Sequence, residues 1–196
     1  MSNPEDVLFS PAVKAEQTRL GSRVLFEDRE WKTEITDDLR QFLKVVDTFF
    51  LATASADGQP YIQHRGGPPG FLKAIGRNTL AFADFAGNRQ YITLGHLKEN
   101  DRAHIFILHF ATRQRVKLWG RARVVEGDVE LMERLVDPRY KAKPERAIVF
   151  ALEAWDVNCQ QHITARYSEA EIAPAVDRLA ERIKELEEEI ARLKAS

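Results

Sequence analysis

The sequence has almost no cysteine and no long apolar run. Its single cysteine, Cys159, excludes a disulfide framework within the chain, so nothing indicates an oxidising compartment. No apolar stretch approaches the ~20 residues of a membrane-spanning helix. Residues 1–10 lack the basic start and the apolar stretch of a signal peptide. We therefore expect a soluble, cytoplasmic protein with no membrane partner.

The sequence also lacks a strong excess of charge of either sign. Its 29 lysines and arginines nearly balance its 30 aspartates and glutamates, and the formal net charge is −1. A general nucleic-acid binder would carry a clear basic excess, so we expect no nucleic-acid partner. Apolar residues make up 44% of the 196 residues, which is enough for one packed domain with an appendage.

The residue pattern predicts two short helices followed mainly by strands. Ser10 followed by Pro11 is typical of a helix start, and we expect this helix to end at Gly21. Thr36 begins a second helix, in which apolar residues recur at helical spacing. Seven strands joined mainly by hairpins predict an antiparallel barrel, so the expected fold class is mainly β with helices. These strands are expected over 48–54, 59–64, 71–75, 79–83, 103–110, 114–126 and 147–155.

The C-terminal segment, residues 167–196, differs in kind from the rest. Its apolar residues are spaced alternately by four and three, which is a heptad repeat: Ile172, Val176, Leu179, Ile183, Leu186, Ile190 and Leu193. β-Branched residues at a and leucine at d favour a parallel two-stranded coiled coil, and hence a homodimer. A single helix packed on its own domain is the alternative, because coils this short are marginal. We expect Pro174 in the first turn of the helix, which tolerates it.

Residues 83–97 combine the end of a strand, a sharp turn and a helix start. We expect a helix over 88–100 with Asn88 as its N-cap, and free backbone amides at a helix start attract phosphate. Arg89 would add a guanidinium group suited to phosphate oxygens. Alone this is a moderate signal, because many helices begin with asparagine and carry a nearby arginine.

A glycine-rich break follows the strand expected over 59–64. The residues His64, Arg65, Gly66 and Gly67 stand before two prolines. Glycines let a planar ligand or a phosphate approach the backbone closely, and Arg65 could then meet an anion. The alternative is a loop that merely turns a corner, which is the more common role of a lone glycine pair.

The strand expected over 114–126 alternates between an apolar face and a polar face. The polar face could be ordinary solvated surface, or one end of it could line an anion site. Solvated surface is the better interpretation for Arg121 and Arg123, whereas both interpretations remain open for Arg115 and Lys117.

The histidines and the cysteine form no metal-site or nucleophile pattern. His104 and His109 differ by five on a strand and therefore face opposite ways. His96 has no ligand at the i+4 position of its helix, and Cys159 has no companion. We expect no metal site and assign no catalytic residue.

Three ordered motifs together resemble the pyridoxamine 5'-phosphate oxidase-like flavin proteins. They are RGGPPGF, DFAGNRQY and WDVNCQQHI, and the resemblance covers about residues 40–166. It implies a dimeric split β-barrel that binds flavin mononucleotide (FMN) in clefts between two subunits. We therefore expect a helical extension over 1–35, an FMN-binding split barrel over 36–166 and a coiled-coil helix over 167–196.

The resemblance also implies where FMN would bind. Gln63 stands where the oxidase has a phosphate-binding arginine, and Arg65 could take over that charge. Arg89 keeps the arginine of the helix start, whereas Gln90 replaces a lysine. Arg115 aligns with a ring-contacting glutamine and could reach the flavin of the partner subunit. The expected cofactor-binding residues are Gln63, His64, Arg65, Gly66, Gly67, Asn88, Arg89, Gln90, Arg115, Lys117, Gln161 and His162.

Gln161 and His162 belong to the third motif. The pair could donate hydrogen bonds to flavin carbonyls or lie over the ring, and the equally open alternative is that this segment only caps the barrel.

FMN would make the protein an oxidoreductase acting on a small molecule. The C-terminal arginine and histidine with which the oxidase holds pyridoxal phosphate are not seen, because the chain continues into heptads. Pyridoxamine phosphate is therefore not the expected substrate. The alternatives are a non-catalytic flavin-binding dimer (a sensor, carrier or storage protein) and a haem- or deazaflavin-binding protein, in which His64 or His162 could serve as the axial haem ligand.

Overall fold

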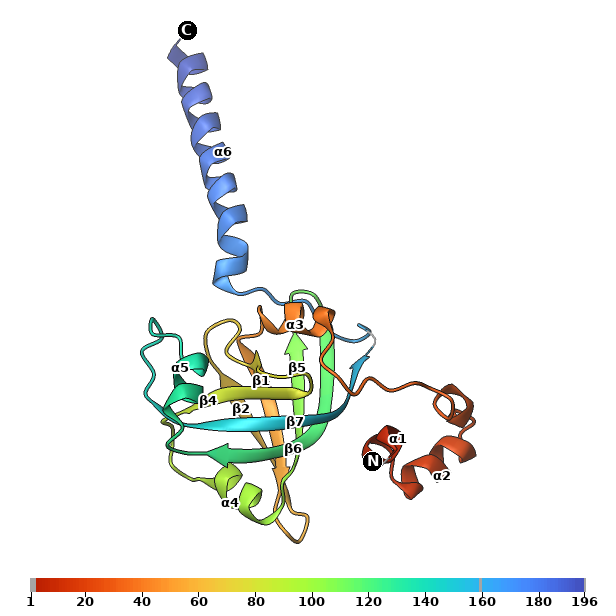
Figure 1. The fold of residues 1–196 in the computed structure, drawn as a ribbon. Helices are drawn as coiled ribbons and strands as arrows, with labels where there is room; N and C mark the ends of the chain where they lie inside the picture. Colours follow the sequence, from red (N-terminus) through yellow and green to blue (C-terminus); the bar gives the residue numbers. More distant parts are fainter. Residues whose placement is uncertain (1–2, 159, 196) are drawn as a thin grey trace. The chain divides into compact units, whose positions relative to one another are not determined.

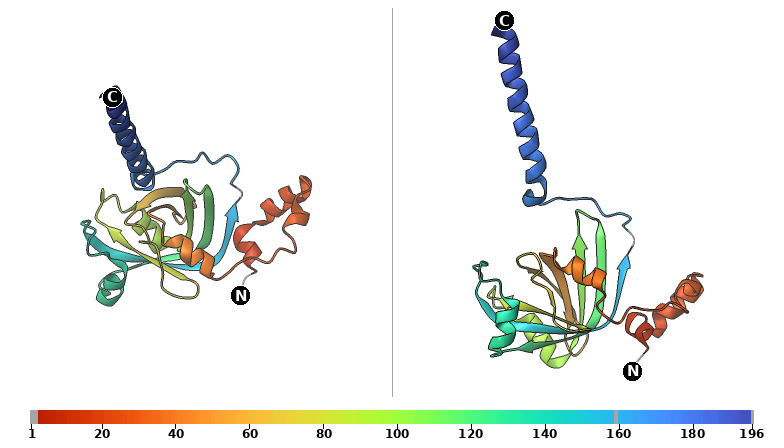
Figure 2. Two further views of the ribbon diagram at one scale, coloured as in Figure 1. Left: turned by 90° about the horizontal axis from the view of Figure 1, so that it is seen from above. Right: turned by 45° about the horizontal axis from the view of Figure 1, so that its top comes forward.

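The computed structural model describes residues 3–158 and 160–195, which form two compact units (Figures 1 and 2). The first unit comprises the residues up to His109 together with Gln114–Gln160. The second comprises Phe110–Arg113 and the residues from Gln161 onward. Among the described helices, none is both long and apolar enough to cross a membrane.

The first unit is built on one antiparallel sheet of seven strands, which curls into a barrel-like shape (Figure 2). The strand order is β2-β1-β5-β6-β7-β4-β3. This mainly antiparallel sheet with helices agrees with the predicted fold class. The strands are β1 (Thr48–Ala54), β2 (Pro60–Gly66), β3 (Lys73–Ala74), β4 (Thr79–Phe85), β5 (Arg102–His109), β6 (Gln114–Val125) and β7 (Pro144–Asn158).

Five short helices accompany this sheet, and the sequence predicted α2 and α3 correctly. The Ser10 hydroxyl caps α2 by accepting from the Val13 amide, and the Thr36 hydroxyl caps α3 by accepting from the Leu39 amide, each at 3.4 Å. The helices α1 and α5 were not predicted from the sequence. The helices are α1 (Pro4–Leu8), α2 (Pro11–Arg19), α3 (Asp37–Leu43), α4 (Ile92–Glu99) and α5 (Val129–Leu135), with a 3₁₀ turn at Arg23–Leu25.

Most of the core lies on the inner face of the curled sheet, and a smaller cluster packs between the other face of β4 and β7 and α5. In β1 every second residue is buried, so Phe49 points inward while its neighbour Phe50 lies on the outer face. The Phe49 ring stacks on Phe71 at 5.3 Å and meets Phe82 edge-on at 5.0 Å. Each such side chain contributes about 1.5–3 kcal/mol of burial free energy, so this cluster anchors β1, β4 and the glycine-rich loop to one another.

The prediction of a helix starting at Asn88 is wrong, because α4 begins at Ile92. Asn88 instead forms a local turn, in which its side-chain oxygen accepts from the Gln90 amide at 3.2 Å. Arg89 and Tyr91 have positive φ angles of 61° and 55°, which no helical residue adopts. The asparagine therefore shapes the loop before the helix and does not cap it.

The second unit contains the long helix α6 (Glu169–Ala195). A capping box fixes its start: the Ser168 hydroxyl accepts from the Glu171 amide at 3.3 Å, and the Ser168 amide donates to the Glu171 carboxylate at 2.7 Å. Because the helix begins at Glu169, Pro174 lies inside it and not in the first turn, which corrects that prediction.

Candidate functional site

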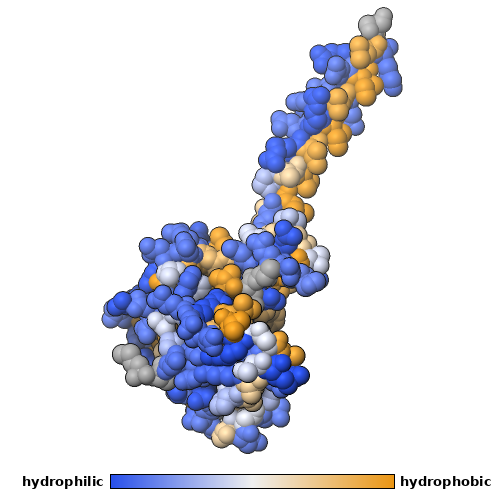
Figure 3. Space-filling view, turned by 90° about the vertical axis from the view of Figure 1, so that its right-hand side faces the viewer, coloured by the Kyte–Doolittle hydropathy of each residue, from blue (hydrophilic) through white to orange (hydrophobic). Residues whose placement is uncertain are grey.

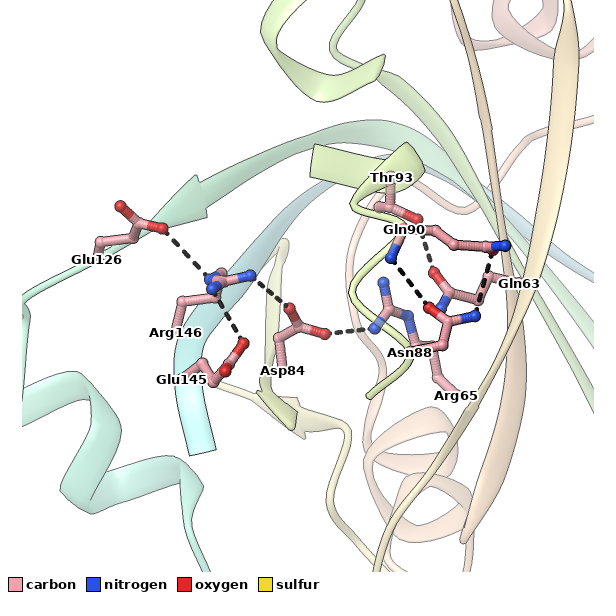
Figure 4. Close-up of polar contacts among 9 residues, drawn as sticks. All are labelled: Gln63, Arg65, Asp84, Asn88, Gln90, Thr93, Glu126, Glu145 and Arg146. Carbon is pink, nitrogen blue, oxygen red and sulfur yellow. Dashed lines mark hydrogen bonds and ion pairs between the residues drawn. The ribbon is translucent and has the colours of Figure 1, made fainter. Parts of the chain in front are cut away.

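A cavity of about 240 Å³ opens where β2, the end of β4, the start of α4 and the start of β7 meet (Figure 4). It brings together residues from strands that are far apart in the sequence. Its lining residues are Tyr61, Gln63, Arg65, Asp84, Phe85, Gly87, Asn88, Arg89, Gln90, Tyr91, Ile92, Thr93, Leu94, Glu145 and Arg146.

The two-residue period of β2 decides which of its side chains reach the cavity. In the antiparallel register, Gln63 pairs with Leu51 and Arg65 pairs with Phe49, and both partners are buried on the inner face. Residues paired across strands point to the same face of a sheet. Gln63 and Arg65 therefore point inward, whereas His64 between them points outward.

Two arginines from different strands share one buried carboxylate. Arg65 of β2 donates to one oxygen of Asp84, and Arg146 of β7 donates to the other oxygen at 3.5 Å. Arg146 also donates to Glu145 at 3.0 Å, and Glu126 lies 3.3 Å from its Nε. Since the Asp84 side chain is only 7% exposed and each guanidinium side chain 13%, this network holds both arginines firmly in place.

Both arginines keep a buried donor without a hydrogen bond. The Nε atoms of Arg65 and Arg146 have no hydrogen-bond partner within the described part of the chain. Glu126 is close to the Arg146 Nε, but the contact is an ion pair without hydrogen-bond geometry. A buried unpaired donor costs free energy, so these groups are suited to an added acceptor such as an anion.

Among the lining side chains the charges leave a small positive excess, although Glu126, outside the lining, also pairs with Arg146. Three arginines, Arg65, Arg89 and Arg146, face the two carboxylates of Asp84 and Glu145. The first turn of α4 also borders the cavity, and the backbone amides of a first helical turn attract anions. The geometry therefore favours an anionic group over a cationic one.

Neutral hydrogen bonds fix the start of α4 against β2. The Thr93 hydroxyl, in a residue only 3% exposed, donates to the Gln63 side-chain oxygen at 2.8 Å. The Asn88 amide group donates to the side-chain oxygen of Gln90 at 3.2 Å (Figure 4). Gln63, Asn88, Arg89 and Gln90 thus line one cavity, and their role in binding a cofactor stays a prediction.

The glycine-rich break has a packing role. The Gly67 amide donates to the Asp47 carbonyl at 3.0 Å, and the Gly70 amide donates to the Val46 carbonyl at 2.9 Å. A Cβ atom on Gly67 would lie 2.5 Å from Cγ of Phe71, so only glycine fits there. Gly66 and Gly67 are not lining residues of the cavity.

His64 and Lys117 lie on the outer face of the sheet, away from the cavity lining. Five residues that pair in succession across β2, β1, β5, β6 and β7 form one row on this face. They are His64, Phe50, Phe106, Lys117 and Asp156. The His64 Nε2 lies 2.6 Å from the Thr48 hydroxyl. Burial lowers the pKa of Lys117, while Asp156, whose carboxylate is 4.0 Å from the Lys117 Nζ, opposes that shift.

Arg115 and His104 occupy the same outer face. Arg115 stands opposite Leu108 of β5, two residues along β6 from Lys117. The His104 ring meets Trp119 edge-on at 4.8 Å. Burial, helped by the Lys117 charge, lowers the pKa of His104 to about 4, so its imidazole is neutral at pH 7.

Gln161 and His162 lie in the second unit, and both are exposed. His162 has a positive φ of 61°. In the same unit, the Arg166 guanidinium lies 5.1 Å from the centre of the Phe110 ring.

Three residues of the site were not predicted from the sequence: Asp84 and Thr93, which are buried, and Arg146, which is half-buried. Asp84 belongs to the DFAGNRQY motif, and an acidic residue within an otherwise apolar strand could have drawn attention. Arg146 stands at the start of an apolar strand, where nothing in the local pattern distinguishes it from a surface residue.

A family model described as Pyridoxamine 5'-phosphate oxidase matches residues 35–185. The chain belongs to this family. The family assignment agrees with the resemblance based on the three motifs. No curated protein sequence matches the chain.

Solved structures with the same fold are distant in sequence. HupZ of Group A Streptococcus, as its H111A variant, is 17% identical with a TM-score of 0.51, covering 63% of this chain and 99% of that chain. HupZ without that substitution is 16% identical with a TM-score of 0.51, covering 67% and 99%. A protein of Lactobacillus delbrueckii described as a candidate pyridoxamine 5'-phosphate oxidase is 16% identical with a TM-score of 0.48, covering 64% and 95%. At these identities the two HupZ structures show a shared fold only.

Proposed function

We propose that this member of the family is an FMN-dependent oxidoreductase acting on a small molecule, and that its sheet is a split barrel holding the FMN phosphate in the cavity described above. The observation that carries the proposal is that Arg65 and Arg89, from two motifs far apart in the sequence, line one cavity at the first turn of α4. When bound, FMN would supply hydride and electron transfer.

The residues present fit a phosphate group. Arg89 lines the cavity and would donate to phosphate oxygens, and the unpaired Nε atoms of Arg65 and Arg146 would gain an acceptor. Asp84 would not repel the ligand as a free carboxylate would, because both of its oxygens already accept from arginines.

One copy of the chain provides only part of an FMN site. Ligand pockets usually enclose about 300–1,000 Å³, and the cavity of about 240 Å³ lies below that range. It suits the phosphate end, so the flavin ring needs another surface. The outer sheet face has apolar side chains that are half-buried or exposed in one copy: Phe50, Ile62, Phe106, Leu108 and Trp119.

We therefore propose a homodimer in which this outer face of one copy completes the flavin site of the other. His64, Arg115 and Lys117 lie on the outer face and would then approach the partner's flavin. A cation beside the pyrimidine end of the ring favours negative charge there, as flavin reduction requires.

Binding measurements on the ligand-free protein test the phosphate assignment. FMN and riboflavin differ only by the phosphate, so the protein should bind FMN much more tightly. Arg89→Ala should weaken FMN binding about 10- to 150-fold, the equivalent of roughly 1.5–3 kcal/mol for one charge-assisted contact, and should leave riboflavin binding unchanged. Arg19→Ala, on the exposed surface of α2, is the matched control. Equal losses for both ligands would show that Arg89 does not contact the phosphate.

Steady-state kinetics tests the oxidoreductase role separately. The flavin-loaded protein should be reduced by NADH or NADPH and reoxidised by oxygen or a dye over many cycles. Tight FMN binding without turnover with any donor would instead indicate a non-catalytic flavin-binding dimer.

A further inference from the structure

The helix α6 presents an apolar stripe to solvent. None of Glu169–Ala195 is buried. Figure 3 shows apolar residues running along one side of the helix, beside hydrophilic residues. The stripe residues are 41–70% exposed: Ile172, Val176, Leu179, Ile183, Leu186, Ile190 and Leu193. Exposing an apolar stripe of this length to water is unfavourable, so we expect another apolar surface to bury it.

The stripe has the geometry of a coiled-coil seam. Its residues follow a 3.5-residue period, which keeps a narrow apolar line facing one partner helix. Proline has no N–H and its ring clashes with the preceding turn, so Pro174 sets a boundary before the regular repeat. The repeat then runs over 176–193, with a positions at Val176, Ile183 and Ile190.

The charged residues beside the stripe favour a second copy in parallel. In a parallel pair, Arg182 at g faces Glu187 at e of the other helix, and Glu189 at g faces Lys194 at e. Two-fold symmetry repeats both pairs. In an antiparallel pair with full overlap, g faces g, so Arg182 meets Glu189 but Glu187 faces Ala180 and gains no partner. The parallel arrangement thus satisfies more charges.

The residues at the a and d positions of α6 also favour a parallel pair. β-Branched residues at every a position and leucine at every d position favour two parallel strands, whereas antiparallel pairing would mix a with d residues in each layer.

We propose that α6 binds α6 of a second copy as a parallel, in-register, two-stranded coiled coil. About three heptads are marginal for an isolated pair. A contact between the sheet faces of the same two copies would raise the effective concentration of the helices and so stabilise the coil. The coil contains no residue of the proposed FMN site.

Disulfide crosslinking of the full chain tests whether α6 pairs with α6 of a second copy, and whether the two helices are parallel. In a Cys159→Ser background, Ile190→Cys should crosslink to itself under mild oxidation, because a residues face each other in a parallel coil. Glu188→Cys, on the opposite side of the helix, is the control and should not crosslink. In the antiparallel register Ile190 would face Leu179, so crosslinking only in a mixture of Ile190→Cys and Leu179→Cys proteins would overturn the parallel proposal. Absence of both crosslinks would overturn the coil.

Charge reversal tests the register. Arg182→Glu should lower the crosslinking yield of the Ile190→Cys protein, because two carboxylates would then face each other. Adding Glu187→Arg should restore the yield. A yield unchanged by either substitution would show that these residues do not face each other. Crosslinking of the FMN-free protein should show the same pattern, which separates this proposal from the flavin proposal.

Discussion

At the scale of single residues, Asp84 connects the two arginines of the cavity, and its removal should be costly. Asp84→Asn would leave the buried guanidinium groups of Arg65 and Arg146 without their shared counter-charge. Breaking a buried pair typically costs about 3–5 kcal/mol. Urea unfolding should show a loss of this size, and Glu16→Gln, in an exposed pair on α2, should show little change.

Inorganic phosphate provides a second readout for the same variant. If the cavity accepts anions, phosphate should restore part of the stability lost in Asp84→Asn, because ligand bound to the folded state stabilises it. No stabilisation of either protein by phosphate would argue against anion binding beside these arginines.

His104 should make stability depend on pH. Its pKa is lowered from 6.5 to about 4 by burial and by Lys117, so the unfolded chain binds a proton more readily between these values. The stabilising effect of the neutral imidazole is complete above pH 6.5 and is lost as the pH falls toward 4, for a total of up to about 3 kcal/mol.

Unfolding free energies measured between pH 4 and 7 check this prediction. The His104→Gln protein should show a shallower fall in stability with acidification than the unmodified protein. If the unfolding free energies of the two proteins fall equally with pH, His104 is protonated equally in the folded and the unfolded state.

Sequence pattern predicted some site residues and not others for identifiable reasons. Gln63, Arg65 and Arg89 belong to contiguous motifs, and strand alternation or turn chemistry indicates their place. Arg146 reaches the cavity only because β7 pairs with β4, so that Arg146 stands opposite Asp84. Pairing between strands so distant in sequence leaves no local signal.

At the scale of elements, two glycines with opposite environments should respond oppositely to alanine. A Cβ atom on Gly120 would overlap the Ala151 carbonyl oxygen at the bulge between β6 and β7, whereas a Cβ atom on Gly95 of α4 would meet nothing within 4 Å. Gly120→Ala should destabilise the protein by about 3 kcal/mol or more. Gly95→Ala should stabilise it by up to about 1 kcal/mol, since glycine disfavours a helix interior.

Thermal unfolding of both glycine variants checks this pair. A stable Gly120→Ala protein would contradict the close approach of β7 to β6, and a destabilised Gly95→Ala protein would contradict the open space beside α4.

The seven strands and the starts of α2 and α3 were predicted from the sequence, whereas the start of α4 was not. Alternation in 114–126 and the hairpin at Asp57-Gly58 depend on local chemistry, and both are confirmed by β6, β1 and β2. The start of α4 was misplaced because asparagine serves equally well in a helix cap and in a turn, and only the left-handed backbone at Arg89 and Tyr91 separates the two.

At the scale of the whole molecule, the proposed homodimer should depend on the outer sheet face. Ile62 is 61% exposed on β2, so Ile62→Asp should leave the fold of one copy intact. In the dimer the same substitution would bury an unpaired carboxylate, and it should therefore weaken both association and FMN binding.

Sedimentation of the full chain at several concentrations measures this effect. Val129→Asp, at a similarly exposed position of α5, is the control. A dimer unaffected by Ile62→Asp would place the interface elsewhere, for example on α6 alone.

The visible absorption spectrum of the purified full chain, with the mass of its released ligand, tests whether the protein binds FMN. We expect flavin absorption bands and a released molecule with the mass of FMN, at one per chain. A haem spectrum, the mass of a deazaflavin, or a colourless protein that does not take up added FMN would contradict it.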